Sequence, residues 1–108
     1  MFVKAFEFSR LREGAFEVAA VERTLLLLVW PEGGRLRAFQ GLCPHALEPL
    51  SDARFDGDVL VCPYHKWTFD GATGNCVRGR KCRLAEYPLE IRGDAVMVDV
   101  AGIRPNRA

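Results

Sequence analysis

The chain has 108 residues, of which 49% are hydrophobic, and its 15 basic and 14 acidic residues leave a formal net charge of +1. This length suits one compact domain, and so small a charge offers no field that would attract nucleic acid or an anionic membrane. The longest purely apolar run, Leu25 to Trp30, is far shorter than the roughly 20 residues of a membrane span. We therefore expect a cytoplasmic protein with no signal peptide that binds neither nucleic acid nor membrane.

The first part of the chain is typical of short strands separated by turns. Residues 15–22 and 24–30 are expected to form successive strands, the second apolar on both faces and therefore buried. The turn sequence PEGG at 31–34 then reverses the chain into a further segment at 35–40. At most a short turn of helix is expected, near 9–13.

The second part of the chain combines long loops with one hairpin. Residues 41–54 and 71–83 are rich in glycine, proline and polar side chains without periodicity, and they predict loops. Alternating apolar residues at 87–92 and 96–100, with Gly93-Asp94 between them, predict a β-hairpin. The fold class is therefore all-β, and such long loops in a small domain need something else to order them.

Both histidines and two of the four cysteines fall into two short motifs, CPH at 43–45 and CPYH at 62–65. These spacings let each turn aim a thiol and an imidazole at one point, and the proline after each cysteine stiffens the loop. Without a secretory signal, cysteines indicate metal or redox chemistry more often than disulfides. The candidate metal ligands are Cys43, His45, Cys62 and His65.

This donor set fits two kinds of metal centre. One is a single tetrahedral zinc ion, and the other is a [2Fe-2S] cluster with two thiolates on one iron and two imidazoles on the other. Zinc fingers of the Cys2His2 kind place their cysteines together and their histidines together, whereas each motif here supplies one of each. Ligand identity alone leaves both centres open.

The order C-x-H, sixteen residues, then C-x-x-H resembles the ligand pattern of the Rieske iron-sulfur family. The segments LSDARFDGD at 50–58 and WTFDGATG at 67–74 are also similar to that family. Further along, CRLAEYPLEIRGD at 82–94 and GIRPN at 102–106 resemble the ferredoxin component of toluene-type aromatic monooxygenases.

The resemblance implies a single Rieske domain over residues 1–108. It would have an antiparallel basal sandwich or barrel, built from about 1–40 and 84–108, and an inserted cluster-binding subdomain at about 41–83. The resemblance also implies one Rieske-type [2Fe-2S] cluster held by the four candidate ligands. Two aromatic residues beside the second motif, Tyr64 and Trp67, are candidates for shielding the cluster or contacting a partner.

Nothing in the sequence indicates an enzyme acting by itself. Both histidines are already assigned, so none remains for a mononuclear oxygenase iron, and no glycine-rich nucleotide fingerprint is present. The resemblance implies a carrier of single electrons from an NADH-dependent flavoprotein reductase to the di-iron hydroxylase of an aromatic monooxygenase.

Two other functions remain open at this point. One is the ferredoxin of a ring-hydroxylating dioxygenase, and the other is an interaction domain stapled by zinc. The remaining cysteines, Cys76 and Cys82, match no four-thiolate ferredoxin spacing, and we interpret them as spare buried or surface thiols.

Overall fold

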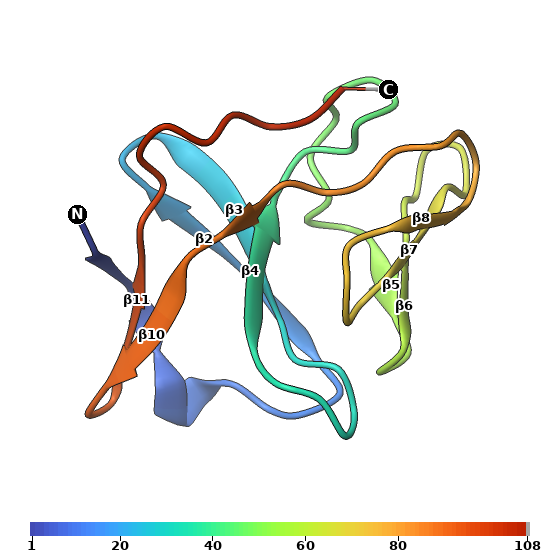
Figure 1. Cartoon of the computed structure of the whole chain (residues 1–108). Helices are drawn as coiled ribbons and strands as arrows, with labels where there is room; N and C mark the ends of the chain where they lie inside the picture. The colour runs from blue at the N-terminus through green and yellow to red at the C-terminus, as the bar shows by residue number, and fades with distance from the viewer. Residues whose placement is uncertain (108) are drawn as a thin grey trace.

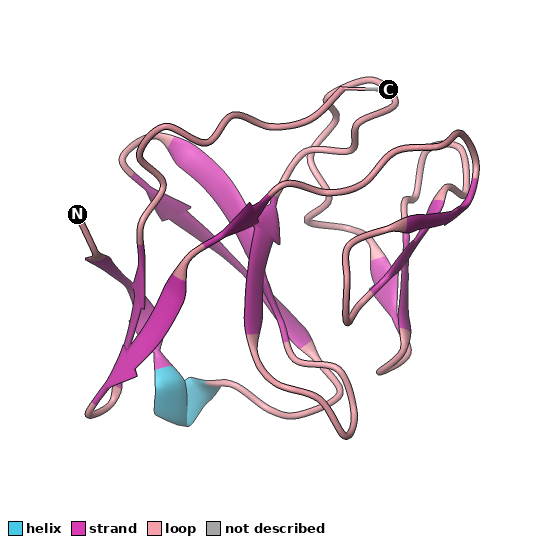
Figure 2. Ribbon diagram, in the orientation of Figure 1, coloured by secondary structure: helices cyan, strands magenta, loops and turns pink. Residues whose placement is uncertain are grey.

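A computed structural model of the chain describes residues 1–107, which form strands, loops and a single helical turn at η1 (Phe8–Arg10). The strands make three antiparallel sheets (Figures 1 and 2). The first sheet has the order β1 (Val3–Glu7), β11 (Ala95–Val98), β10 (Leu89–Arg92). The second has the order β2 (Phe16–Val21), β3 (Thr24–Val29), β4 (Arg37–Gln40), β9 (Glu86–Tyr87). The third has the order β5 (Arg54–Phe55), β6 (Val59–Val61), β7 (Thr68–Asp70), β8 (Cys76–Arg78).

This arrangement confirms the all-β class, the two central strands and the C-terminal hairpin. Strands β2 and β3 lie within the two segments predicted as successive strands, 15–22 and 24–30, and β10 pairs with β11 across the predicted turn. The structure differs at 71–83, which was predicted as a loop but contains β8. That strand has only three residues, two of them exposed, so it leaves no periodic pattern to detect.

Strand β3 is apolar on both faces because it lies between two hydrophobic cores. Leu26 and Leu28 belong to the core between the first and second sheets, together with Val96 and Val98. The alternate side chains of β3 point the other way, into the core between the second and third sheets. Members of this second core are Leu27, Val29, Phe39, Cys43, Leu50, Leu60, Cys62, Phe69 and Leu84.

Pro88 marks the point where the chain leaves one sheet for another. Tyr87 on its N-terminal side pairs with Ala38 of β4, and Leu89 on its C-terminal side pairs with Val98 of β11. Proline has no N–H to contribute to a ladder and is found at strand ends for that reason. The corner therefore joins the second sheet to the first (Figure 1).

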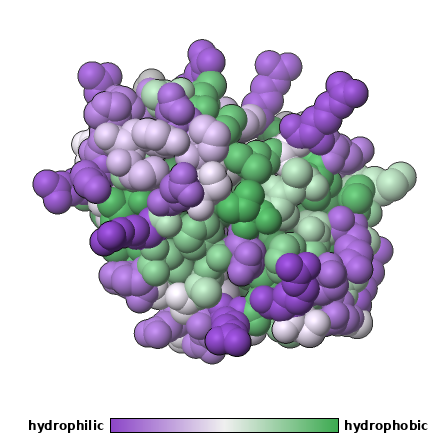
Figure 3. Space-filling model, turned by 180° about the vertical axis from the view of Figure 1, so that it is seen from behind, coloured by the Kyte–Doolittle hydropathy of each residue, from purple (hydrophilic) through white to green (hydrophobic). Residues whose placement is uncertain are grey.

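The surface combines apolar and charged areas. Seen from the side opposite to Figure 1, apolar side chains gather across the middle of the face, and polar and charged side chains surround them (Figure 3). Such a mixture is ordinary for a small domain, whose polar atoms cannot cover its whole surface. Within residues 1–107, no helix has the length and apolar character needed to cross a membrane.

Candidate metal centre

The first candidate ligand loop is a tight turn that begins at Cys43. The Cys43 N–H donates to the carbonyl of Glu48 at 2.7 Å, and the Leu47 N–H donates to the carbonyl of Cys43 at 2.7 Å. Leu47 has a φ of 52°, in the left-handed region, which turns the chain back on itself. His45 lies at the exposed tip of this turn.

The second candidate ligand loop has the same backbone. The Cys62 N–H donates to the carbonyl of Trp67 at 2.7 Å, and the Lys66 N–H donates to the carbonyl of Cys62 at 3.1 Å. Lys66 has a φ of 60°, again left-handed. His65 is exposed at the tip, immediately before this residue.

The two loops therefore share these backbone features, and they differ in which residue of the turn is the histidine. The third residue of the turn is His45 in one loop and Tyr64 in the other, and the fourth is Ala46 in one and His65 in the other. The unequal spacings C-x-H and C-x-x-H thus arise from neighbouring positions on one type of turn.

The two loop cysteines lie in the second hydrophobic core, each only 1% exposed. Burial is the main cause that raises the pKa of the Cys43 thiol to about 12, and the neighbouring Cys62 thiol raises it further. The backbone N–H of His45 lies within hydrogen-bonding reach of the Cys43 sulfur and acts in the opposite direction. A thiolate at this position therefore needs a nearby cation, which a metal ion bound to the sulfur would supply.

The two histidine side chains meet outside this core. Their ring centroids are 4.2 Å apart and the ring planes are inclined at 59°. Both side chains are exposed, while both cysteines are buried. The donor atoms thus form an inner pair of sulfurs and an outer pair of imidazoles.

Trp67 supports the imidazole pair from one side. Its ring centroid is 4.8 Å from that of His45. On another side it meets Gly79, where a Cβ atom would come within 2.7 Å of the indole ring. Only glycine allows so close an approach, and this residue also has a φ of 132°, which other residues rarely adopt.

A buried glutamine fixes the segment that leads into the first ligand loop. Gln40 is fully buried, and its Nε2 donates to the carbonyls of Leu42 at 2.6 Å and Asn106 at 3.1 Å. Its Oε1 accepts from the N–H groups of Ala85 at 2.7 Å and Asn106 at 2.8 Å. The C-terminal segment is thereby held beside the first ligand loop, as its red trace shows in Figure 1.

The sequence pattern singled out the four candidate ligands, and the structure brings their side chains to one end of the molecule. It leaves Tyr64 exposed at the tip, 47% accessible, and Trp67 half-buried beside His45. Neither Gln40 nor Gly79 belongs to a sequence motif that predicts a functional site. The available signal for Gln40 was a polar residue at the end of a predicted strand, three residues before Cys43.

The donor arrangement fits one of the two candidate centres. A [2Fe-2S] cluster takes two thiolates on one iron and two imidazoles on the other. The inner sulfur pair and the outer imidazole pair fit that cluster.

Residues 1–88 match the family model for the Rieske [2Fe-2S] domain. The ferredoxin component of the alkene monooxygenase system of Xanthobacter autotrophicus is 33% identical over 82% of this chain and 72% of that protein. The ferredoxin component of the naphthalene 1,2-dioxygenase system of Pseudomonas aeruginosa is 30% identical over 93% of this chain and 96% of that protein.

A solved structure gives the same result for the fold. The ferredoxin of Sphingomonas yanoikuyae B1 matches with a TM-score of 0.79 and 25% identity, over 92% of this chain and 98% of that chain. The family match implies one Rieske-type [2Fe-2S] cluster. The chain therefore belongs to the Rieske [2Fe-2S] domain family and is an electron-transfer ferredoxin of the kind found in oxygenase systems.

Proposed function

We propose that Cys43 and Cys62 hold the inner iron of the cluster and that His45 and His65 hold the outer iron. The observation that carries this assignment is the pair of equal turns, which bury both thiols in one core and expose both imidazoles at one tip. When bound, the cluster accepts and releases one electron. The surrounding side chains of the second core exclude water from the sulfur side.

The exposed imidazole pair is the proposed point of electron entry and exit. Electron transfer needs a short distance between centres, so a partner has to approach the tip that carries His45 and His65. Tyr64 is exposed at this tip and is proposed to contact the partner, while Trp67 covers one side of the imidazoles. A small contact area is sufficient, because redox encounters use small interfaces.

The proposed donor is an NADH-dependent flavoprotein reductase, and the proposed acceptor is the di-iron hydroxylase of a toluene-type aromatic monooxygenase. The segments 82–94 and 102–106, with their resemblance to such ferredoxins, support this pair of partners. The similarity to an alkene monooxygenase ferredoxin supports a monooxygenase partner more generally. We further propose a cytoplasmic protein in which residues 41–83 act as the cluster-binding subdomain.

A second candidate is the ferredoxin of a ring-hydroxylating dioxygenase. The observation in its favour is the similarity to the naphthalene dioxygenase ferredoxin, which aligns over 93% of this chain. The two candidates share the cluster and the ligands and differ only in the oxygenase that receives the electron.

The first test is a measurement of composition and spectrum on anaerobically purified protein. We expect about two iron and about two acid-labile sulfide per chain, with an EPR signal after dithionite reduction whose average g lies below that of four-thiolate clusters. Stoichiometric zinc with no EPR signal, persisting after cluster reconstitution, would contradict the proposal.

The second test distinguishes the oxygenase partners. The ferredoxin is mixed with NADH, a reductase, and either a di-iron hydroxylase or a ring-hydroxylating dioxygenase, and product formation is followed. We expect turnover with the di-iron hydroxylase. Turnover confined to the dioxygenase would establish the second candidate instead.

A further inference from the structure

The two cysteines outside the ligand loops face each other. Asn75 pairs with Arg83 in an antiparallel bridge, so the next opposed pair is Cys76 and Cys82, and the Cys76 N–H donates to the Cys82 carbonyl at 3.0 Å. Opposed residues of antiparallel segments have Cα atoms about 4.5–5.5 Å apart, within the range that a disulfide spans. The Cys82 thiol also lies within hydrogen-bonding reach of the Cys76 side chain.

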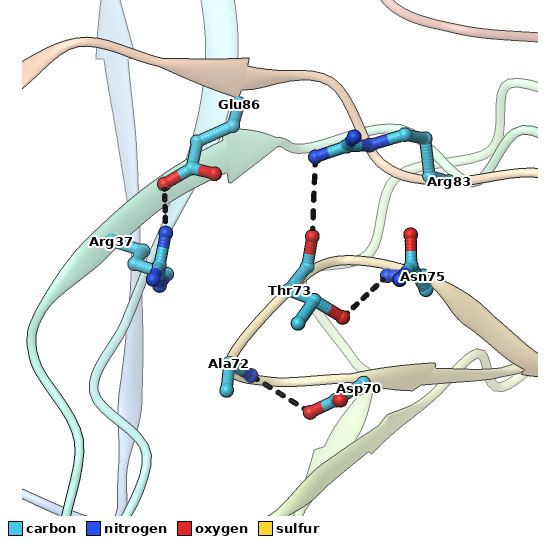
Figure 4. A network of polar contacts seen from close by, with 7 residues as sticks. All are labelled: Arg37, Asp70, Ala72, Thr73, Asn75, Arg83 and Glu86. Atoms are coloured by element: carbon cyan, nitrogen blue, oxygen red, sulfur yellow. Dashed lines mark hydrogen bonds and ion pairs between the residues drawn. The ribbon is translucent and has the colours of Figure 1, made fainter.

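Polar contacts hold one end of this pair of segments (Figure 4). The Asp70 carboxylate accepts from the Ala72 N–H at 2.9 Å, and the Thr73 hydroxyl accepts from the Asn75 N–H at 3.2 Å. The Arg83 guanidinium donates to the Thr73 carbonyl at 3.4 Å. These contacts fix the backbone on the side where the ladder begins, so the two thiols stay opposed.

The pair is accessible to small molecules. Both cysteines are partly exposed, and they line a cavity of about 570 Å³. Three cationic side chains, Lys81, Arg83 and Arg107, line the same cavity. A cavity with this charge attracts anions, so an anionic reagent for thiols would concentrate there.

The segment between the two cysteines touches the candidate metal centre. It contains Gly79, whose backbone packs on the Trp67 ring, and that ring lies 4.8 Å from the His45 imidazole. A bond between the two cysteines would therefore change how Gly79 packs on the Trp67 ring and, through that ring, the surroundings of the His45 imidazole.

We propose that Cys76 and Cys82 form a reversible dithiol site, that anionic low-molecular-weight disulfides such as oxidised glutathione oxidise it, and that Trp67 transmits its state to His45. The first part stands independently of the proposed function, whereas the transmission to His45 rests on it.

The reaction is thiol–disulfide exchange in two steps. The Cys76 thiolate attacks one sulfur of the small disulfide and releases one small thiol, and Cys82 then attacks the Cys76 sulfur and releases the second. Two protein thiols are oxidised, one small disulfide is reduced to two thiols, and the two protons pass to the released thiols.

The test uses the iron-loaded protein under anaerobic conditions with oxidised glutathione, followed by alkylation, trypsin and mass spectrometry. Cleavage after lysine and arginine separates the two cysteines into peptides 67–78 and 82–83, neither of which contains a loop cysteine. We expect these two peptides joined by a disulfide, about tenfold above the level without glutathione disulfide. Cys76→Ser and Cys82→Ser are the matched controls and should give no joined peptide.

Two outcomes would overturn the dithiol site. One is alkylation of both cysteines after treatment, and the other is a joined peptide that contains Cys43 or Cys62, which would report loss of the cluster. The visible absorbance of the cluster is recorded in each sample, so that damage to the cluster is recognised.

Visible circular dichroism of the oxidised cluster tests the transmission to His45, because it needs no reductant that would also reduce the disulfide. We expect glutathione disulfide to change the spectrum of the wild type and not that of Cys82→Ser. An unchanged wild-type spectrum alongside the joined peptide would overturn the transmission alone. Absence of a cluster spectrum in untreated protein would instead contradict the proposed function.

Discussion

The two candidate ligand loops have the same backbone and different supports. Each begins with a cysteine followed by proline, closes with a left-handed residue, and is capped by the same pair of backbone hydrogen bonds. The loop at 43–48 is held by Gln40 and the C-terminal segment, whereas the loop at 62–67 is held by Trp67 and Gly79.

This difference shows that a pair of equal turns does not need equal surroundings. The turn itself fixes where the sulfur and the imidazole point, since its hydrogen bonds are internal. The supports decide how firmly each turn is attached to the rest of the domain. Substitutions in ligands, supports and connecting turns should therefore have separable effects.

Substitution of an imidazole should have the largest effect. In His45→Cys or His65→Cys, an additional thiolate adds a negative charge, so we expect either loss of the cluster or a reduction potential lower by roughly 100 mV or more. Protein-film voltammetry measures the potential. Tyr64→Phe is the matched control, because Tyr64 occupies in the second loop the position of His45 in the first. An unchanged potential and spectrum in either histidine variant would contradict the ligand assignment.

Removal of the buried amide should weaken the first loop selectively. Gln40→Leu leaves the backbone groups of Leu42, Ala85 and Asn106 without their partner, at a cost of about 2–4 kcal/mol in the free energy of unfolding. Urea unfolding measures this cost. Hydrogen exchange should speed up at 41–48 before it does at 62–67, and equal acceleration in both loops would show that the supports are not separate.

A methyl group at Gly79 should disturb the second loop. In Gly79→Ala the new Cβ atom would come within 2.7 Å of the Trp67 ring, and alanine is strained at this φ, so we expect about 1–3 kcal/mol of destabilisation. Gly33→Ala is the control for a methyl group at a positive φ, since nothing lies within 4 Å of a Cβ atom added at Gly33. Thermal unfolding of both variants measures the two losses, and equal losses would exclude a specific contact with Trp67.

The smallest effect should come from the acidic turn that precedes β6. The backbone N–H groups of Val59 and Asp58 donate to the carboxylate of Asp56 and hold its pKa below the usual value. Because the folded state favours the ionised form, this stabilisation is present above the ordinary Asp pKa and is lost as the pH falls through the lowered folded-state value.

Asp56→Asn should therefore lose less stability than the wild type on acidification from about pH 5 to about pH 3. Urea midpoints at both pH values measure the difference, and Asp52→Asn, in the preceding loop, is the control. Equal losses in the wild type and Asp56→Asn would show that the carboxylate contributes nothing to folding.

Much of the fold could be predicted from the sequence, because the pattern of apolar residues along a strand reflects which of its faces are buried. Strand β3 is apolar on both faces since two cores meet there, and the hairpin of β10 and β11 alternates around a clear turn. Strand β8 could not be predicted. It has only three residues, which is too few to show an apolar alternation, and it pairs with β7 only because the chain reverses between them.

The candidate site also has features that the sequence predicted and features that it did not. Spacing and residue type singled out Cys43, His45, Cys62 and His65, because metal ligands are few and chemically distinct. The equality of the two turns was not visible, since it depends on backbone hydrogen bonds that CPHALE and CPYHKW do not share as a sequence pattern. The opposed placement of Cys76 and Cys82 depends on a register that only the folded chain defines.

The position of β3 between the two cores has a consequence for cooperativity. Leu27 and Leu28 are neighbours on β3, yet each is fully buried in a different core. If β3 leaves one core it also leaves the other, so the two cores unfold together. A ligand that binds only the folded state stabilises everything that unfolds together with its site. We therefore expect the whole domain, the distant hairpin of β10 and β11 included, to unfold in one transition whose midpoint falls when iron is removed.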